Sequence, residues 1–342
     1  MSGWNYDLST QYGRNEVDFE ILNTLNASLG AASPTEFDAG GLEYTQWVSN
    51  FDVSRDIAGL FQRTTLALGL EYRRETFQLS AGEPDSFRFG GVTINQNNPL
   101  NSSTAGAAPG SQVFPGFQPT IGGVSVVDGN ARNNFSAYAE LDIDVIEQWN
   151  VQLAGRYEDY SDFGSDWNGK IATRFEATDW LALRGAVSTG FRAPGVAQQF
   201  FAAAATNNVN GVLVDAVTLP VGNPVAQALG STPLKAETAV NWSVGAVFNP
   251  IPRFNLTVDW FQINIDDRIV LTENLTASRD AAGNPSGNAT QQAIAQILND
   301  AGFNTISAAR FFINGVDTRT RGIDAIATYR MDIGDEGKLN LT

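Results

Sequence analysis

The stretch "WLALRGAVSTGFRAP", residues 180–194, alternates apolar side chains with small or polar ones. Successive side chains of a β-strand point to opposite faces, so this pattern predicts a strand that removes one face from water. That face carries Leu181, Leu183, Val187, Thr189 and Phe191, and the other carries Ala182, Arg184, Ala186 and Ser188. The apolar face could contact a protein core or another apolar medium. Residues 180–194 alone do not distinguish the two, so the rest of the sequence has to be considered.

Composition removes most enzyme classes. The chain has 342 residues and a formal net charge of −16, with no Cys and no His. A disulfide framework, a zinc cluster and a thiol nucleophile are therefore excluded, as are the usual general base and metal ligand. We expect no enzymatic activity, no cofactor and no resident metal, and the acidic chain gives no sign of binding nucleic acid.

Hydropathy does not decide whether the chain meets a membrane. Its mean hydropathy is −0.15, and no apolar run of helix-spanning length occurs. Transmembrane strands are apolar only at alternate positions, so such averages do not detect them. The first residues, "MSGWNYDLST", carry no secretory signal. We therefore expect either a protein that stays inside the cell or an incomplete chain.

The alternation of apolar with polar or small side chains recurs along the whole sequence. It predicts about 11 strands, most of them longer than is usual in globular proteins and long enough to cross a bilayer at a tilt. They lie near residues 4–14, 45–56, 62–79, 132–146, 149–162, 166–177, 180–192, 236–248, 253–269 and 314–332, with another that begins at 337.

Short and long connections take turns between these strands. The short ones lie near 56–61, 147–148, 178–179 and 249–253, and the long ones span 15–44, 80–131, 195–234 and 271–312. One end of the predicted sheet thus has tight turns and the other has large loops, as in outer-membrane barrels. Because bacterial barrels close with an even number of strands, an odd set indicates a piece of a barrel.

Aromatic residues fall near both ends of the predicted strands. Trp149 and Trp180 follow short turns, whereas Tyr157, Tyr160 and Phe191 lie near the opposite ends, as two interfacial girdles require. The same aromatics could fill the core of a soluble sandwich, so this alternative remains open.

Four local patterns are weaker. "GSDWNGKI", residues 164–171, has the spacing of a phosphate-binding loop, but Ile171 replaces the required hydroxyl residue and a strand follows, so we expect a hairpin tip and the first residues of a strand. The carboxylates of "DIDVIE" are interpreted as a solvated lumen face rather than a catalytic pair. In residues 288–303, one helical face is predicted to carry Ile294, Ile297, Leu298 and Ala301, either as a lid or as a loop stiffener. Acidic residues of the first loop could hold divalent cations, although solvation explains them too: Glu16, Asp18, Glu20, Glu36, Asp38 and Glu43.

Three later segments resemble, in the same order, the landmarks of one known family. "STGFRAPGVAQQFF" is similar to a strand that ends in Phe-Arg-x-Pro, matched by Phe191, Arg192 and Pro194. "PLKAETAVNWSVGAVF" resembles Leu-Lys-Pro-Glu-Thr followed by a strand, with Ala236 in place of Pro. "NGVDTRTRGIDAIATY" resembles a later strand of the family. The remaining matched positions are Leu234, Lys235, Glu237, Thr238, Gly245, Asn314, Gly322, Ile323 and Asp324. Together these segments resemble the TonB-dependent receptors; residues 132–342 carry the resemblance, and residues 1–131 fit it more loosely.

The resemblance implies an all-β fold: an antiparallel transmembrane β-barrel in the bacterial outer membrane, with long extracellular loops and short periplasmic turns. Residues 1–342 would form about half of a 22-stranded barrel domain, without the plug that closes the lumen. The implied partners are outer-membrane lipid and lipopolysaccharide, the TonB complex through the missing plug, and a scarce substrate, either an iron–siderophore complex or a carbohydrate.

Substrate contacts are expected near the mouth and on the inner wall, at Phe87, Arg88, Phe89, Arg156, Glu158, Phe200 and Phe201. Packing of the loops would explain the aromatic ones equally well. Two other functions stay open at this point, a soluble or secreted β-rich binding module and a passive porin.

Overall fold

The computed structural model describes residues 3–91, 113–209, 212–280, 282–304, 306–333 and 337–342. Its main feature is an 11-stranded sheet in the order β1-β2-β3-β6-β7-β8-β9-β12-β13-β16-β17. Every neighbouring pair in this sheet is antiparallel. The expectation of an all-β antiparallel architecture is confirmed. The strands are β1 (Asn5–Leu22), β2 (Glu36–Asp56), β3 (Arg63–Ala81), β6 (Asn130–Ile146), β7 (Trp149–Tyr160), β8 (Gly164–Thr178), β9 (Leu181–Arg192), β12 (Glu237–Phe248), β13 (Phe254–Leu271), β16 (Phe312–Ile333) and β17 (Gly337–Leu341).

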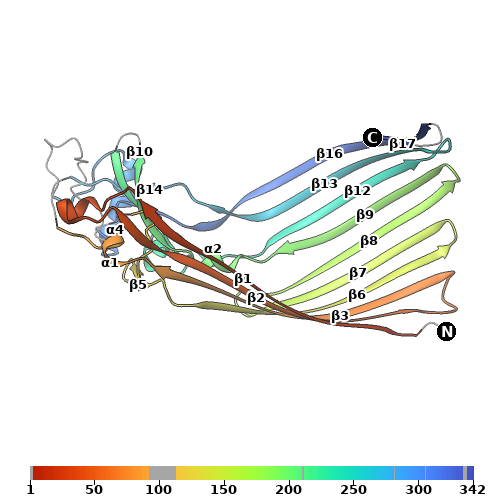
Figure 1. Cartoon of the computed structure of the whole chain (residues 1–342), viewed down its shortest axis with the longest axis horizontal. Coiled ribbons are helices and arrows are strands. Elements are labelled where there is room, and N and C mark those ends of the chain that lie inside the picture. Colours follow the sequence, from red (N-terminus) through yellow and green to blue (C-terminus); the bar gives the residue numbers. More distant parts are fainter. Residues whose placement is uncertain (1–2, 92–112, 210–211, 281, 305, 334–336) are drawn as a thin grey trace.

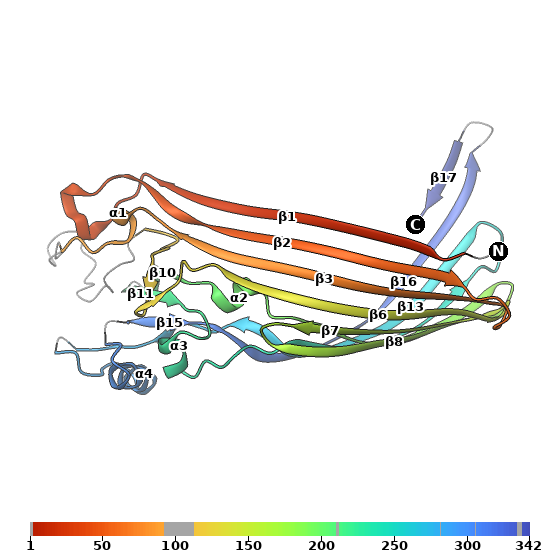
Figure 2. The same ribbon diagram turned by 90° about the horizontal axis from the view of Figure 1, so that it is seen from below.

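The sheet curls into a trough whose two edges are β1 and β17 (Figures 1 and 2). Tight turns connect the strands at one end, which we call the turn end. The long connections gather at the other, the loop end, as the alternation of segment lengths predicted. Among the described residues, no helix is long and apolar enough to cross a membrane.

The two faces of the sheet differ in chemistry. The concave face carries Glu75 and Arg132, and α2 (Val196–Phe200) packs beside them on β3 and β6. On the convex face, large apolar side chains are open to solvent, among them Val244 at 63% and Ile323 at 70% exposure. The stretch 180–194 obeys this division, because Leu183 is 47% exposed while Arg184 pairs with Asp259 on the opposite face.

Glycines on the middle strand allow side chains two strands apart to meet on the concave face. Arg184 and Asp259 lie on β9 and β13, and Gly245 of β12 lies between them in the register. A Cβ atom at Gly245 would come within 1.9 Å of Asp259 Oδ1. Gly69 has the same role beneath the hydrogen bond from the Tyr138 hydroxyl to Asp52 Oδ1, at 2.6 Å. Absence of a side chain is thus what lets these pairs form.

The prediction of a loop over residues 15–44 was wrong over most of its length. β1 and β2 continue to Leu22 and from Glu36, and only a shorter connection with the 3-10 helix η1 (Ala27–Ala32) joins them. The extensions are rich in charged residues, so hydrophobic alternation did not reveal them. Arg14 binds the carboxylates of Glu16 at 2.9 Å and Glu43 at 2.7 Å, which offsets their repulsion.

Segments from the loops pack into one core at the loop end. A four-stranded sheet in the order β10-β11-β15-β14 unites the connections before and after β12 and β13. Its core includes Leu219, Val225, Leu298 and Phe311, and Phe77 of the main sheet joins it. The remaining elements are α1 (Pro84–Phe87), β4 (Thr120–Ile121), β5 (Val124–Ser125), β10 (Ala203–Val209), β11 (Val212–Thr218), α3 (Pro224–Ala228), β14 (Leu275–Thr276), α4 (Ala289–Asp300) and β15 (Ala308–Arg310).

The helix expected in residues 288–303 exists as α4, but its buried face was partly misassigned. Ile294 and Leu298 are buried as predicted. Ala295 completes this face, whereas Ile297 is 42% exposed and Ala301 is also exposed. The small Ala295 side chain fits where the helix approaches its neighbours closely, a feature that hydrophobicity alone does not rank. The strand expected to begin in residues 164–171 is present as β8, but the hairpin tip lies just before these residues, at 161–163.

Candidate functional site

A buried ion pair lies on the concave face near the loop end. Glu75 of β3 and Arg132 of β6 face each other in the register and are only 7% and 5% exposed. Arg132 Nε and Nη2 both donate to Glu75 Oε2, at 2.9 and 2.5 Å. The Tyr44 hydroxyl on β2 donates to the other oxygen of Glu75. Both charges are therefore compensated at close range, which a buried pair requires.

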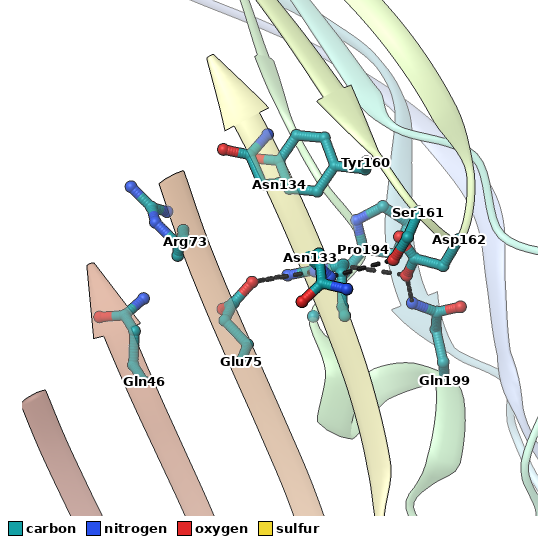
Figure 3. Close-up of polar contacts among 12 residues, drawn as sticks. Gln46, Arg73, Glu75, Asn133, Asn134, Tyr160, Ser161, Asp162, Pro194 and Gln199 are labelled. Carbon is teal, nitrogen blue, oxygen red and sulfur yellow. Dashed lines mark hydrogen bonds and ion pairs between the residues drawn. The ribbon is translucent and has the colours of Figure 1, made fainter. Parts of the chain in front are cut away.

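Arg132 also holds the segment that follows β9. Its Nη1 donates to the Pro194 carbonyl oxygen and lies 3.6 Å from Asp162 Oδ2. Asp162 in turn accepts a 2.7 Å hydrogen bond from Gln199 of α2 (Figure 3). The guanidinium stacks over the Tyr160 ring with its carbon 5.1 Å from the ring centroid. Arg132 thus connects the main sheet, the residues that follow β7 and the residues that precede α2.

A second group of charged residues lies on the same concave face. Arg156 Nε donates to Glu158 at 2.5 Å, and Arg156 Nη2 lies 3.6 Å from Glu71. Glu71 also accepts from Arg73 Nη2 at 2.7 Å, and the Tyr160 hydroxyl donates to Glu158 at 2.8 Å. Within the described part of the chain, Arg73 Nε is buried with no hydrogen-bond acceptor. We call these residues together with Tyr44, Glu75, Arg132 and Asp162 the concave-face network.

The positions matched to the Phe-Arg-x-Pro and Leu-Lys-x-Glu-Thr patterns lie side by side. Arg192 Nε donates to Glu237 Oε2 at 3.0 Å, and Glu237 Oε1 accepts the Ile269 amide at 2.8 Å. Phe191 pairs with Thr238 in the register, and its ring meets the Tyr160 ring edge-on at 5.9 Å between centroids. These contacts fix the strand ends rather than presenting groups to a ligand. Leu234, at 6% exposure, adds apolar burial beside them.

The third matched segment, which contains Asn314, is hydrogen-bonded through this side chain to the second matched segment, which contains Lys235. Asn314 Oδ1 accepts the Lys235 amide at 2.8 Å, and Asn314 Nδ2 donates to the Lys235 and Asp267 carbonyls at 3.0 and 2.6 Å. Further along β16, Gly322 leaves room for the Phe261 ring, since a Cβ there would lie 2.8 Å from it. Asp324 lies opposite Asp259 in the register.

The expected substrate contacts divide into three sets. Arg156 and Glu158 belong to the concave-face network. Phe200 and Phe201 pack against the loop core, and Phe201 meets Phe117 at 6.0 Å, so packing accounts for both. The remaining three, Phe87, Arg88 and Phe89, lie at α1 and just after it, where Arg88 pairs with Asp85 and Phe89 is 49% exposed.

Sequence reasoning missed the centre of the network. Glu75, Arg132 and Tyr44 lie on three successive strands, and their proximity depends on a register that the sequence does not reveal. The available signal was a charged residue at an inward position on β3 and on β6, Glu75 and Arg132. In the described ranges, no group of three or more carboxylates is placed to hold a metal ion.

Comparison with known proteins identifies the family. The family model "TonB dependent receptor-like, beta-barrel" matches residues 2–342. The chain therefore belongs to the TonB-dependent receptor β-barrel family, and the resemblance stated from its three landmarks is confirmed. Members of this family are receptors and transporters, so the expectation that the chain is not an enzyme is confirmed as well.

Solved structures cover nearly all of this chain and the curated relative covers less than half of it, and all of them extend beyond it. The probable TonB-dependent siderophore receptor PirA of Acinetobacter baumannii is 28% identical over 149 residues, which are 43% of this chain and 19% of that protein. The crystal structure of PirA from A. baumannii superposes with a TM-score of 0.55 at 18% identity, over 96% of this chain and 40% of that one. A ferric enterobactin receptor (PfeA) mutant from Pseudomonas aeruginosa, solved with enterobactin, gives 0.60 at 15% identity over 98% and 40%. The chain thus spans about two fifths of these solved receptors, and at these identities they show the fold alone.

Proposed function

We propose that residues 1–342 form part of the barrel wall of an outer-membrane receptor that imports an iron–siderophore complex with energy supplied through TonB. The contrast between the two faces of the sheet carries this proposal. Exposed Trp242, Val244 and Ile323 on the convex face suit contact with lipid, whereas the charged network on the concave face suits a hydrated lumen.

Closure into a 22-stranded barrel belongs to the same proposal. β1 and β17 are the edges of the described sheet, and backbone groups of an open edge would remain unpaired in lipid. Further strands that pair with both edges would satisfy those groups. The convex face would then be surrounded by outer-membrane lipid, including lipopolysaccharide, and a plug inside the lumen would provide the connection to the TonB complex.

Two alternatives are less well supported. A soluble binding module would cover Ile323 and Val244, which are 70% and 63% exposed here. A passive porin would keep the mouth of the barrel open, whereas the loops of this chain pack into a core with Leu219 and Leu298 fully buried. A siderophore is favoured over a carbohydrate because PirA is described as a probable siderophore receptor and PfeA as a ferric enterobactin receptor.

The test uses the whole chain refolded in detergent. Ferric enterobactin and a malto-oligosaccharide serve as probes, and quenching of the intrinsic tryptophan fluorescence reports binding. We expect a heat-modifiable folded form on gels and saturable quenching by the iron complex alone. Saturable binding of the sugar alone would overturn the siderophore assignment. A compact monomer in buffer without detergent would overturn the barrel wall, and binding of neither probe would show that this part carries no substrate surface.

A further inference from the structure

Two arginines face outward from β16 at the loop-end border of the apolar convex face. Arg321 pairs with Gln262 of β13, and Arg319 pairs with Asn264. The next pair toward the turn end is Trp260 with Ile323, whose 70% exposure places it on the convex face. Side chains two residues apart on a strand share a face, so Arg319 and Arg321 lie on the convex face too. We call them the Arg319–Arg321 patch.

Two tryptophans lie beside the patch, Trp242 level with Arg321 and Trp260 level with Ile323. Trp242 of β12 pairs with Gln262 and is 49% exposed, and Trp260 is 39% exposed. Tryptophan is enriched where a membrane protein meets the lipid headgroups. The patch therefore lies at headgroup level, just beyond Val244 and Ile323.

Among the described residues, neither guanidinium of the patch has an acidic partner. No carboxylate of the described chain lies within 4.0 Å of either one, and both side chains are exposed. Arg319 Nε donates to Asn264 Oδ1 at 2.9 Å, which orients it without neutralising it. Asp266, two residues beyond Asn264 on β13, pairs with Thr238 of β12 in the register and with neither guanidinium. By contrast, Arg132, Arg156, Arg184 and Arg192 each bind a carboxylate.

We propose that the Arg319–Arg321 patch binds the phosphomonoester headgroup of a membrane lipid. Residues two apart on a strand are about 6–7 Å apart along it, so both guanidiniums can reach one phosphate group. The guanidinium fork matches phosphate oxygens in a bidentate geometry, and the weak hydration of arginine favours this site over bulk water. The apolar surface below the patch receives the acyl chains. This inference rests on the proposed function, because it needs the convex face to lie in a bilayer.

The experiment uses the refolded chain in phosphatidylcholine bilayers. A minor fraction of either phosphatidic acid or phosphatidylcholine carries brominated acyl chains, which quench tryptophans such as Trp242 and Trp260 on contact. Each arginine near a membrane surface contributes about 1 kcal/mol of attraction to anionic lipid, so two should enrich phosphatidic acid roughly tenfold or more. We expect brominated phosphatidic acid to quench much more strongly than brominated phosphatidylcholine.

Variants separate the patch from overall charge. Arg319→Gln with Arg321→Gln should reduce quenching by phosphatidic acid towards the level of phosphatidylcholine. The matched control, Arg63→Gln with Arg174→Gln, removes two positive charges that pair with Asp144 and Glu176, and it should behave as the native chain. Arg319→Lys with Arg321→Lys keeps the charge but loses the fork, so it should retain part of the preference and also shows whether substitution here permits folding.

Each of the remaining outcomes would refute one specific claim. Equal quenching by both lipids in the native chain, or an unchanged preference in the Gln pair, would refute the patch and leave the barrel wall standing. Loss of the preference on adding inorganic phosphate would indicate a free-phosphate site rather than a lipid site. Absence of quenching by any brominated lipid would refute the proposed membrane wall itself.

Discussion

At the scale of single residues, the Glu75–Arg132 pair combines the deepest burial with the greatest number of partners in the network. Replacing Arg132 by Gln would leave Glu75 without its cation, at 7% exposure. We expect unfolding in urea, followed with the refolded chain in detergent, to show a loss of about 3–5 kcal/mol. Glu75→Gln combined with Arg132→Gln should lose less, since no charge then stays buried alone.

The comparison for this prediction is the Arg174–Glu176 pair, whose side chains are 50% and 45% exposed. Arg174→Gln should cost about 0–1 kcal/mol, because solvent screens an exposed pair. Equal losses for Arg132→Gln and Arg174→Gln would show that the buried pair is not what holds the start of α2 to the wall.

Gly245 tests whether the concave-face pairs need a glycine between them. In Gly245→Ala the new methyl group would meet Asp259 and separate it from Arg184. We expect a loss of about 1–3 kcal/mol in the free energy of unfolding, typical of overpacking. Gly190→Ala is the matched control on the neighbouring strand, because a methyl group there would have no neighbouring heavy atom within 4 Å. Asp259→Ser in the Gly245→Ala background should recover part of the loss.

At the scale of elements, α4 allows two neighbouring residues to be compared. Leu298 is fully buried in the loop core, whereas Ile297 beside it is 42% exposed. Leu298→Ala should destabilise the core by about 2–5 kcal/mol, and Ile297→Ala should stay within roughly 0.5 kcal/mol. Hydrogen exchange of residues 289–300 would measure the difference. Similar exchange in both variants would mean that α4 is not anchored by its buried face.

Sequence periodicity located the strands of the main sheet well because each has an apolar convex face. It failed at residues 15–22 and 36–44, where the ladder continues through charged side chains such as Glu16 and Glu43. It also missed β10, β11, β14 and β15, because β11 and β15 pair in parallel across distant parts of the chain. The formation of these strands and the choice of the buried face of α4 depend on contacts with segments distant in the sequence, rather than on any local pattern.

The candidate site was recovered in part for the same reason. Arg156 and Glu158 could be assigned to the inner wall from alternation alone. Tyr44, Glu75 and Arg132 required knowledge of which positions on β2, β3 and β6 face each other. The landmark residues Glu237 and Asn314 were found by resemblance, yet their contacts with Ile269 and Asp267 come from folding.

At the scale of the whole molecule, the two faces of the sheet predict opposite responses to charge. Ile323 and Ile326 are both well exposed, at 70% and 53%, but the register places Ile323 on the convex face and Ile326 on the concave one. Ile323→Lys should hinder folding into lipid vesicles, at a cost of up to about 2–4 kcal/mol, whereas Ile326→Lys should be tolerated. The fraction of heat-modifiable protein on gels measures this. Equal yields would argue against a lipid-facing convex surface.

The small loop sheet also bears on the order in which the molecule assembles. Ala216 of β11 pairs with Ala308 of β15, so this contact closes a loop of about ninety residues, and such distant contacts form slowly. The residues between them include β12 and β13, which pair with each other at short sequence separation and should therefore form earlier. The loop core should therefore be the last part to acquire protection during refolding, and its appearance would mark a wall whose strands are already in register.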